Sequence, residues 1–193
     1  MAAAPKPFDR QTIEKAFERL GELAVAAGKI VEISVYGGAA LVLTLNHRPA
    51  TRDVDAVFER DRGFVRRAAE MVAAEFGWAS DWMNDSVKGF LSRNDTAREA
   101  KSLFKSYPSG GSEGLRILVA SPAYLFAMKC LAMRAGDVTS RGDTDDIRSL
   151  GTLLDVASTR QAIEVISRFY PANALPPKTR FGLEEIFGPE SPL

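Results

Sequence analysis

The 193-residue sequence contains one cysteine, Cys130, one histidine, and no excess of either charge, since 25 basic residues balance 25 acidic ones. A single cysteine cannot form an internal disulfide, so we expect a fold held by packing and a cytoplasmic location, where thiols stay reduced. The scarcity of cysteine and histidine argues against a zinc site and leaves a hard cation held by carboxylates as the metal to look for. The zero formal charge gives no basis for bulk electrostatic binding to nucleic acid or anionic lipid.

The sequence also lacks a long hydrophobic run. No apolar stretch approaches the ~20 residues that a membrane-spanning helix needs. The first ten residues contain Pro5 and Pro7 and no apolar segment of signal-peptide length. We therefore expect no membrane association and no targeting segment.

The first half of the chain alternates between helical and strand patterns. The spacing of apolar residues predicts helices over 8–28, with Asp9 as the N-cap, over 39–45, and over 61–77, where Asp61 caps the helix. It predicts strands over 30–36 and 53–58. Residues 78–96 are harder to interpret, and we expect a turn or short helix around 82–89. The glycine pair Gly37-Gly38 joins the first strand to the second helix.

The second half begins with two further strands and then becomes helical. Residues 103–107 and 115–120 predict an antiparallel hairpin with a long turn. Ser121 and Pro122 predict the start of a helix that runs to about residue 135, and helical patterns recur from 143 to 187. We expect an α/β (α+β) core over residues 1–120, with a small mixed sheet flanked by helices, and a helical part over 121–193 packed on it.

The glycine pair and a nearby pair of acids suggest a site for a charged ligand. Glycines at the start of a helix let an anion approach the backbone, where unpaired N–H groups and the helix dipole favour it. Asp53 and Asp55 are two positions apart on a strand, so they share a face at a Cα separation of about 6.6 Å. Two such carboxylates can jointly hold a divalent cation, and magnesium is the expected one.

These residues resemble the motifs of the DNA polymerase β nucleotidyltransferase superfamily. Tyr36-Gly37-Gly38-Ala39-Ala40-Leu41 and Arg52-Asp53-Val54-Asp55-Ala56-Val57 are similar to its glycine motif and to its pair of acids, with a helix between them. The resemblance implies a nucleotidyltransferase fold in which Gly37 and Gly38 bind the phosphates of a nucleoside triphosphate. It also implies that Asp53 and Asp55 bind one or two magnesium ions and are catalytic.

The AbiEii-type nucleotidyltransferases, which include toxins of type IV toxin-antitoxin systems, show the closer resemblance. They carry an arginine and a threonine or serine before the acids, as do Arg48, Thr51 and Arg52. They also carry a lysine in an apolar helix and a later acidic pair, and residues 126–134 and 143–147 are similar to these. The resemblance implies that Thr51, Arg52 and Lys129 bind the nucleotide and that Asp146 is catalytic with support from Asp143.

One feature departs from the superfamily. Many of its members bring a third carboxylate from a later strand to the metal. The matching strand is expected over 115–120 and carries no acid, so Glu113 or Asp146 would have to substitute.

Each motif also has a simpler interpretation. A glycine pair can be only a tight connection, two alternating acids can be only a solvated strand face, and Lys129 can simply pair with Asp143 or Asp146.

We therefore expect a Mg²⁺-dependent enzyme that moves a nucleoside monophosphate from a triphosphate to an acceptor hydroxyl. The acceptor would be RNA such as tRNA, a protein or a small molecule. The protein would then be a toxin-antitoxin or phage-defence component with a cognate antitoxin. The alternative is a catalytically degenerate member of the same fold that binds nucleotide or a partner protein.

Overall fold

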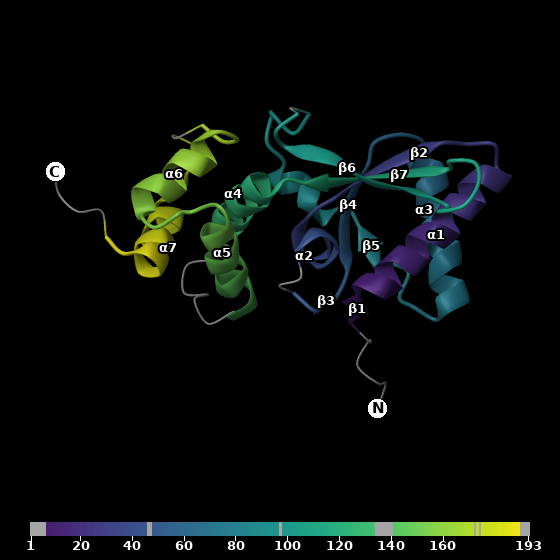
Figure 1. Cartoon of the computed structure of the whole chain (residues 1–193), viewed down its shortest axis with the longest axis horizontal. Helices are drawn as coiled ribbons and strands as arrows, with labels where there is room; N and C mark the ends of the chain where they lie inside the picture. The colour runs from purple at the N-terminus through teal and green to yellow at the C-terminus, as the bar shows by residue number, and fades with distance from the viewer. Residues whose placement is uncertain are drawn as a thin grey trace. The chain divides into compact units, whose positions relative to one another are not determined.

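The structure is a computed structural model that describes residues 7–45, 48–96, 98–133, 141–171, 173 and 175–189. The chain divides into two compact units (Figure 1). The first contains Met1–Gly89 and Ser102–Ala120, and the second contains Phe90–Lys101 and Ser121–Leu193. Helices and strands are both present, as the α+β prediction requires. The second unit includes Phe90–Lys101, which the sequence-based division at residue 120 assigns to the core. The packing of the helical part on the core stays a prediction.

The first unit contains a mixed sheet and its flanking helices. Its elements are β1 (Phe8–Asp9), α1 (Arg10–Ala26), β2 (Val31–Val35), α2 (Gly37–Thr44), β3 (Ala50–Thr51), β4 (Val54–Phe58), α3 (Arg62–Phe76), β5 (Met83–Asn84), the 3₁₀ helix η1 (Ser86–Phe90), β6 (Lys101–Tyr107) and β7 (Leu115–Ala120). Asp9 caps α1 as predicted, because its carboxylate accepts a hydrogen bond of 2.8 Å from the Thr12 N–H.

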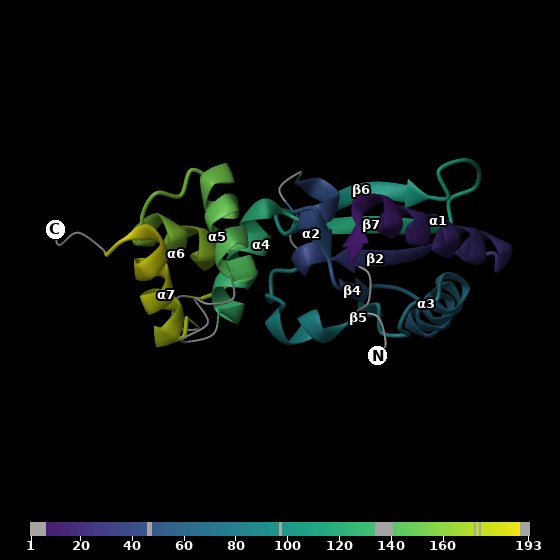
Figure 2. The same cartoon turned by 90° about the horizontal axis from the view of Figure 1, so that it is seen from below.

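Five strands form one sheet in the order β5-β4-β2-β7-β6 (Figure 2). Strand β2 pairs antiparallel with β4 and parallel with β7, and β4 pairs parallel with β5. The neighbouring strands β6 and β7 are joined by residues 108–114, which confirms the predicted hairpin. A separate small pair joins β1 to β3.

The two faces of this sheet differ in polarity. One face buries apolar side chains that form the core with the apolar sides of α1 and α3; they are Val31, Ile33, Val35, Val54, Ala56, Phe58, Leu115, Ile117 and Val119. The registers Ser34↔Val57 and Ser34↔Leu118 define the other face, which also carries Asp55. Asp55 therefore points away from the core.

Two local predictions need correction. Asp61 stands at the N-cap of α3, but its side chain makes no capping hydrogen bond and instead pairs with Lys29. Its backbone is left-handed, with φ of 48°, so its carboxylate is not placed to cap the helix. In the segment 78–96, the strand β5 precedes the expected short helix.

The regular structure of the second unit is helical over its described residues, apart from the start of β6, and residues 91–96 and 98–100 are coil and turn. It contains α4 (Pro122–Ala132), α5 (Arg141–Leu153), α6 (Thr159–Ser167) and α7 (Pro177–Phe187), and α4 packs against the other three. Ser121 caps α4 through a 3.3 Å hydrogen bond from the Tyr124 N–H, as predicted. The predicted end of this helix, near residue 135, lies outside the described residues. Within the described chain, no helix combines the length and apolar character needed to cross a membrane.

Candidate functional site

The turn from β2 into α2 requires a glycine. Gly37 is the first residue of α2 and has φ of +57°, a left-handed conformation that costs residues with a Cβ. Tyr36 precedes it in extended conformation and makes no side-chain cap. The first N–H groups of α2 are therefore not capped by the side chain of the preceding residue, at the positive end of the helix dipole.

The carboxylate of Asp55 lies directly against this turn. A Cβ at Gly37 would stand 2.4 Å from the Asp55 Oδ2, well inside van der Waals contact. The backbone explains the approach, because the Tyr36 N–H donates to the Asp55 carbonyl oxygen at 2.9 Å. The turn formed by Gly37 and Gly38, called the glycine corner below, therefore lies beside Asp55 on β4, as the order of these motifs in the sequence suggests.

The second glycine faces Thr51 and Arg48. A Cβ at Gly38 would stand 2.5 Å from the Thr51 hydroxyl oxygen and 3.3 Å from the Arg48 guanidinium carbon. Thr51 is buried at the end of β3, and the Arg48 Nε donates to the Ala50 carbonyl oxygen at 3.1 Å. A hydroxyl and a cation thus border the N-terminus of α2, where they can contribute to an anion site.

Asp53 joins Asp55 through a residue that sequence reasoning missed. Asn84 lies opposite Asp55 in the β4–β5 register, so its side chain is on the same face of the sheet. The Asn84 Nδ2 donates to the Asp53 Oδ2 at 3.2 Å, and its Oδ1 accepts from the Ser86 N–H at 3.0 Å. The Asn84 amide therefore links Asp53 to the adjacent strand and lies on the same face as Asp55.

Strand β5 is fixed beside β4 by Trp82. The Val54 N–H donates to the Trp82 carbonyl oxygen at 2.7 Å, and the indole N–H of Trp82 donates to the Ala69 carbonyl oxygen at 3.0 Å. A strand of two residues has no detectable periodicity, so the sequence carries no signal for the position of Asn84.

Of the two remaining predicted residues, Arg52 lies next to the acids and Glu113 lies elsewhere. Arg52 is exposed at the bend before β4. Glu113, one of the two expected substitutes for a third carboxylate, precedes β7 and pairs with Arg116 at 2.6 Å and with the Ser106 hydroxyl at 2.5 Å. These hydrogen bonds lower the pKa of the Glu113 carboxyl.

The register of the sheet excludes Glu113 from the site. Strand β7 runs parallel to β2, with Leu115 opposite Val31 and Val119 opposite Val35. Glu113 therefore stands at the start of the strand pair, whereas Gly37 follows its other end. The suggestion that Glu113 replaces the missing carboxylate is wrong.

Lys129, Asp143 and Asp146 form an ion cluster within the second unit. The Lys129 ammonium on α4 lies 2.6 Å from the Asp143 Oδ1 and 2.8 Å from the Asp146 Oδ2, both on α5. The Asp146 side chain is only 5% exposed, whereas that of Asp143 is 61% exposed. The structure thus gives Lys129 the simpler role considered above, an ion pair between helices. Arg134, part of the resembling motif, lies outside the described residues.

The donor set around β4 suits a hard cation. The oxygen atoms of Asp53 and Asp55 belong to ionisable carboxylates on one face of the sheet, and Asn84 turns its amide nitrogen toward Asp53 while its oxygen accepts from the Ser86 N–H. Over the ranges that the structure describes, no group of three or more histidine, cysteine, aspartate or glutamate side chains could hold a metal. Among the described residues, a metal at this place would therefore have two carboxylate ligands, from Asp53 and Asp55.

No family model matches this chain, and comparison with curated proteins and with solved structures gives no match. The assignment of function therefore depends on the geometry of this site and on the motifs that the sequence carries.

Replacing Gly37 with alanine should destabilise the first unit. The added Cβ would both occupy a left-handed position, at a cost of about 1–3 kcal/mol, and displace the Asp55 carboxylate. The control is Gly63→Ala on α3, whose Cβ would meet only ordinary contact with Arg67 at 3.5 Å. Urea unfolding of both variants measures the difference, and equal stability of the two would contradict the close approach of Asp55.

Replacing Lys129 with methionine should destabilise the second unit. The change keeps the length of the side chain but removes the Lys129 charge from the buried Asp146, and breaking a buried pair costs up to about 3–5 kcal/mol. Lys178→Met on α7 is the matched control, because Lys178 is exposed. Thermal and urea unfolding should show a loss for Lys129→Met alone.

Proposed function

We propose that this protein is a Mg²⁺-dependent nucleotidyltransferase that transfers a nucleoside monophosphate from a nucleoside triphosphate to an acceptor hydroxyl. The observation that carries the proposal is the contact between the Asp55 carboxylate and Gly37. It brings a pair of acids to the start of a helix that is suited to bind phosphate. The mixed sheet, in which helices alternate with β2, β4 and β5, supports the nucleotidyltransferase fold that the motifs imply.

The chemistry follows from the residues around the corner. The first turn of α2 and the Thr51 hydroxyl bind the triphosphate, and Asp53 and Asp55 hold magnesium. The metal reduces the negative charge of the triphosphate and stabilises charge on the entering and leaving oxygens. The acceptor oxygen forms a bond to the α-phosphorus, the bond to pyrophosphate breaks, and the hydroxyl proton passes to water. Arg48 and the exposed Arg52 add positive charge near the phosphates.

Lys129 and Asp146 belong to the same proposal only through the motif resemblance. For phosphate to approach Lys129, the ammonium would have to release one of its two carboxylate partners. The exposed Asp143 is easier to release than the buried Asp146. A role in RNA modification or in a toxin-antitoxin pair, with a cognate antitoxin as partner, is part of the proposal on the same basis.

Asp53→Asn and Asp55→Asn should each reduce nucleotide transfer by at least about 100-fold, because each removes a charged metal ligand and keeps the shape of the side chain. Transfer of labelled nucleotide to cellular RNA and protein, with pyrophosphate release, measures the effect. Asp61→Asn is the control, since Asp61 pairs with Lys29 away from the glycine corner. Undiminished transfer by both site variants would refute the metal assignment.

A second candidate function is nucleotide binding without turnover. Asn84 favours it, because the strand beside the acids presents an amide where a further carboxylate would complete the metal site. Two carboxylates bind magnesium less tightly than three. Such a protein would bind nucleotide and signal to a partner protein instead of releasing pyrophosphate.

Asn84→Asp separates the two candidates. A carboxylate at this position adds a third charged oxygen donor, so we expect Mg²⁺ affinity to rise by about tenfold, equivalent to about 1.4 kcal/mol. Titration calorimetry measures the affinity, and Asn94→Asp, an exposed position in the second unit, is the control. An accompanying rise in pyrophosphate release supports the enzyme, and tighter binding without release supports the second candidate. Unchanged Mg²⁺ affinity would contradict a metal site at these residues.

A further inference from the structure

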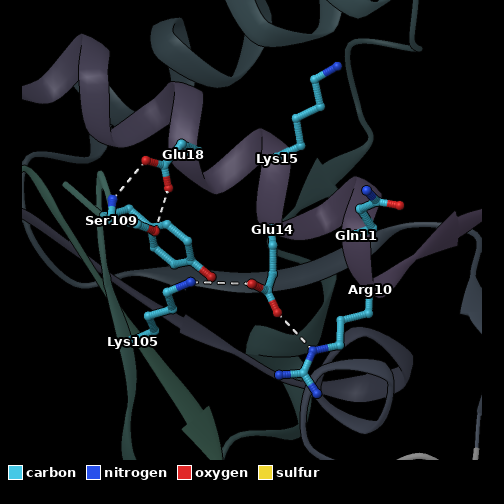
Figure 3. Close-up of a pocket in the computed structure, with 8 residues that line it drawn as sticks. Arg10, Gln11, Glu14, Lys15, Glu18, Lys105 and Ser109 are labelled. Atoms are coloured by element: carbon cyan, nitrogen blue, oxygen red, sulfur yellow. Dashed lines mark hydrogen bonds and ion pairs between the residues drawn. The ribbon is translucent and has the colours of Figure 1, made fainter.

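A groove in the first unit lies apart from the glycine corner, between α1 and β6 (Figure 3). It has a volume of about 590 Å³, and its lining comes from Arg10, Gln11, Glu14, Lys15 and Glu18 on α1, from Lys105 and Tyr107 on β6, and from Ser109. The Tyr107 ring packs on Phe17 of α1, with 5.8 Å between the ring centroids, so an aromatic surface joins the two elements.

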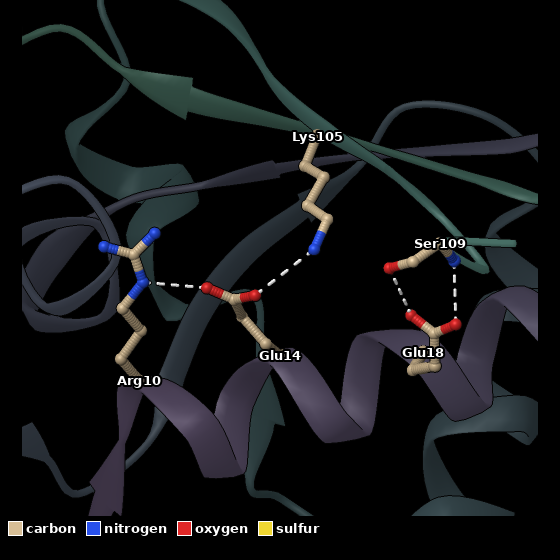
Figure 4. A network of polar contacts seen from close by, with 5 residues as sticks. All are labelled: Arg10, Glu14, Glu18, Lys105 and Ser109. Carbon is tan, nitrogen blue, oxygen red and sulfur yellow. Dashed lines mark hydrogen bonds and ion pairs between the residues drawn. The ribbon is translucent and has the colours of Figure 1, made fainter.

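The carboxylates of the groove already have partners (Figure 4). Glu14 accepts from the Arg10 Nε at 2.8 Å and from the Lys105 Nζ at 3.4 Å. Glu18 accepts from the N–H and the hydroxyl of Ser109 at 2.7 and 2.9 Å. Burial would raise the pKa of Glu14, but Arg10 and Lys105 outweigh this effect and lower it, so Glu14 is ionised at neutral pH.

The cations of the groove retain unused donors. Arg10 engages Glu14 through Nε, and Figure 4 shows its two terminal nitrogens directed away from that carboxylate. Lys105 makes only the long contact to Glu14 and lies over the Tyr107 ring at 4.9 Å. Lys15 also lines the groove, but its ammonium lies over the Phe76 ring at 5.3 Å and points away from these carboxylates. Arg10 and Lys105 are therefore the cations that remain for an occupant, and their donors favour an acidic one.

Tyr107 provides a second, independent observation. Its side chain is fully buried in the wall of the groove, and among the described residues its hydroxyl has no hydrogen-bond partner. Burial and the nearby charges of Glu14 and Glu18 raise its pKa, so the hydroxyl remains a neutral donor. A buried donor without an acceptor is unfavourable, and an incoming oxygen that reached it would satisfy it.

The groove runs beside an edge of the sheet. Strand β6 is the last of the five, and in the described part of the chain only β7 pairs with it. Leu103 in the middle of β6 is 57% exposed. The Tyr107 carbonyl oxygen accepts from the Gly114 N–H, so alternation along the strand directs the backbone groups of Ser102, Phe104 and Ser106 outward. These groups can pair with an added strand.

We propose that an acidic segment of a partner protein binds here in extended conformation, as an added strand on β6. Its backbone pairs with the outward groups of β6, and alternate acidic side chains enter the groove toward Arg10 and Lys105. Lys101 on the same strand is paired with Asp95 at 2.8 Å and is only 10% exposed, so Lys105 and Arg10 provide the charge that favours an acidic strand over a basic one.

A capped peptide of alternating threonine and glutamate, about eight residues long, is the probe, because it matches the seven residues of β6. Fluorescence anisotropy on the full-length chain should show binding that weakens with salt. The same peptide with lysine in place of glutamate should bind at least about tenfold more weakly. Two isomers of the acidic peptide, one N-methylated at every threonine and the other at every glutamate, should differ in affinity. The reason is that only alternate amides of an added strand face β6.

Lys105→Glu should weaken binding of the acidic peptide by at least about tenfold. The matched control is Lys29→Glu, an exposed lysine of similar exposure that pairs with Asp61 elsewhere in the unit. Arg10→Gln is a second variant in case the charge reversal impairs folding, which the circular dichroism of each variant reveals. Hydrogen exchange with peptide bound should show slower exchange at Ser102, Phe104 and Ser106.

Three results would overturn the proposal. Equal binding of both N-methylated isomers would show an acid-binding groove without strand addition. Displacement of the peptide by free glutamate or inorganic phosphate at comparable affinity would identify a small-anion pocket. Absence of peptide binding, or an equal loss in Lys29→Glu, would exclude the surface altogether.

Discussion

The candidate site depends on one backbone hydrogen bond, from the Tyr36 N–H to the Asp55 carbonyl oxygen. It continues the β2–β4 pairing by one residue beyond Val35↔Ala56 and fixes Asp55 beside the start of α2. Because side chains alternate along a strand, a slip of one residue would turn Asp55 into the core and expose Val54 or Ala56. Burial of those apolar side chains therefore also holds the carboxylate against Gly37.

Much of this arrangement could be predicted because it is encoded locally. The caps Asp9 and Ser121 accept hydrogen bonds from N–H groups three residues away. The alternation of residues along β4 predicts which side chains share a face of the sheet. Asn84 could not be predicted, because its position depends on pairing across 29 residues and its strand is too short for periodicity. The resemblance directed attention to β7 for a third carboxylate, whereas β5 is the strand that borders the acids.

The cluster of Lys129, Asp143 and Asp146 shows how a motif can satisfy two interpretations at once. A lysine and two acids one helical turn apart are what an interhelical ion pair needs, and α4 and α5 place them within 2.8 Å. A buried Asp146 requires a cation whether or not phosphate binds nearby. The presence of these residues is therefore weaker support for catalysis than the close approach of Asp55 to Gly37, which an ordinary strand-to-helix connection does not need.

The groove and the glycine corner occupy different parts of the same sheet. The acids are on β4 and the groove borders β6, with β2 and β7 between them, a separation of about 14 Å at the usual strand spacing. A strand added to β6 would extend the sheet away from the acids, so both can be occupied together. They share α1: its first residue, Arg10, lines the groove, and two residues earlier Phe8 pairs with Thr51, whose hydroxyl borders Gly38. The start of α1 is therefore connected through the Phe8–Thr51 pair to the residue that borders Gly38.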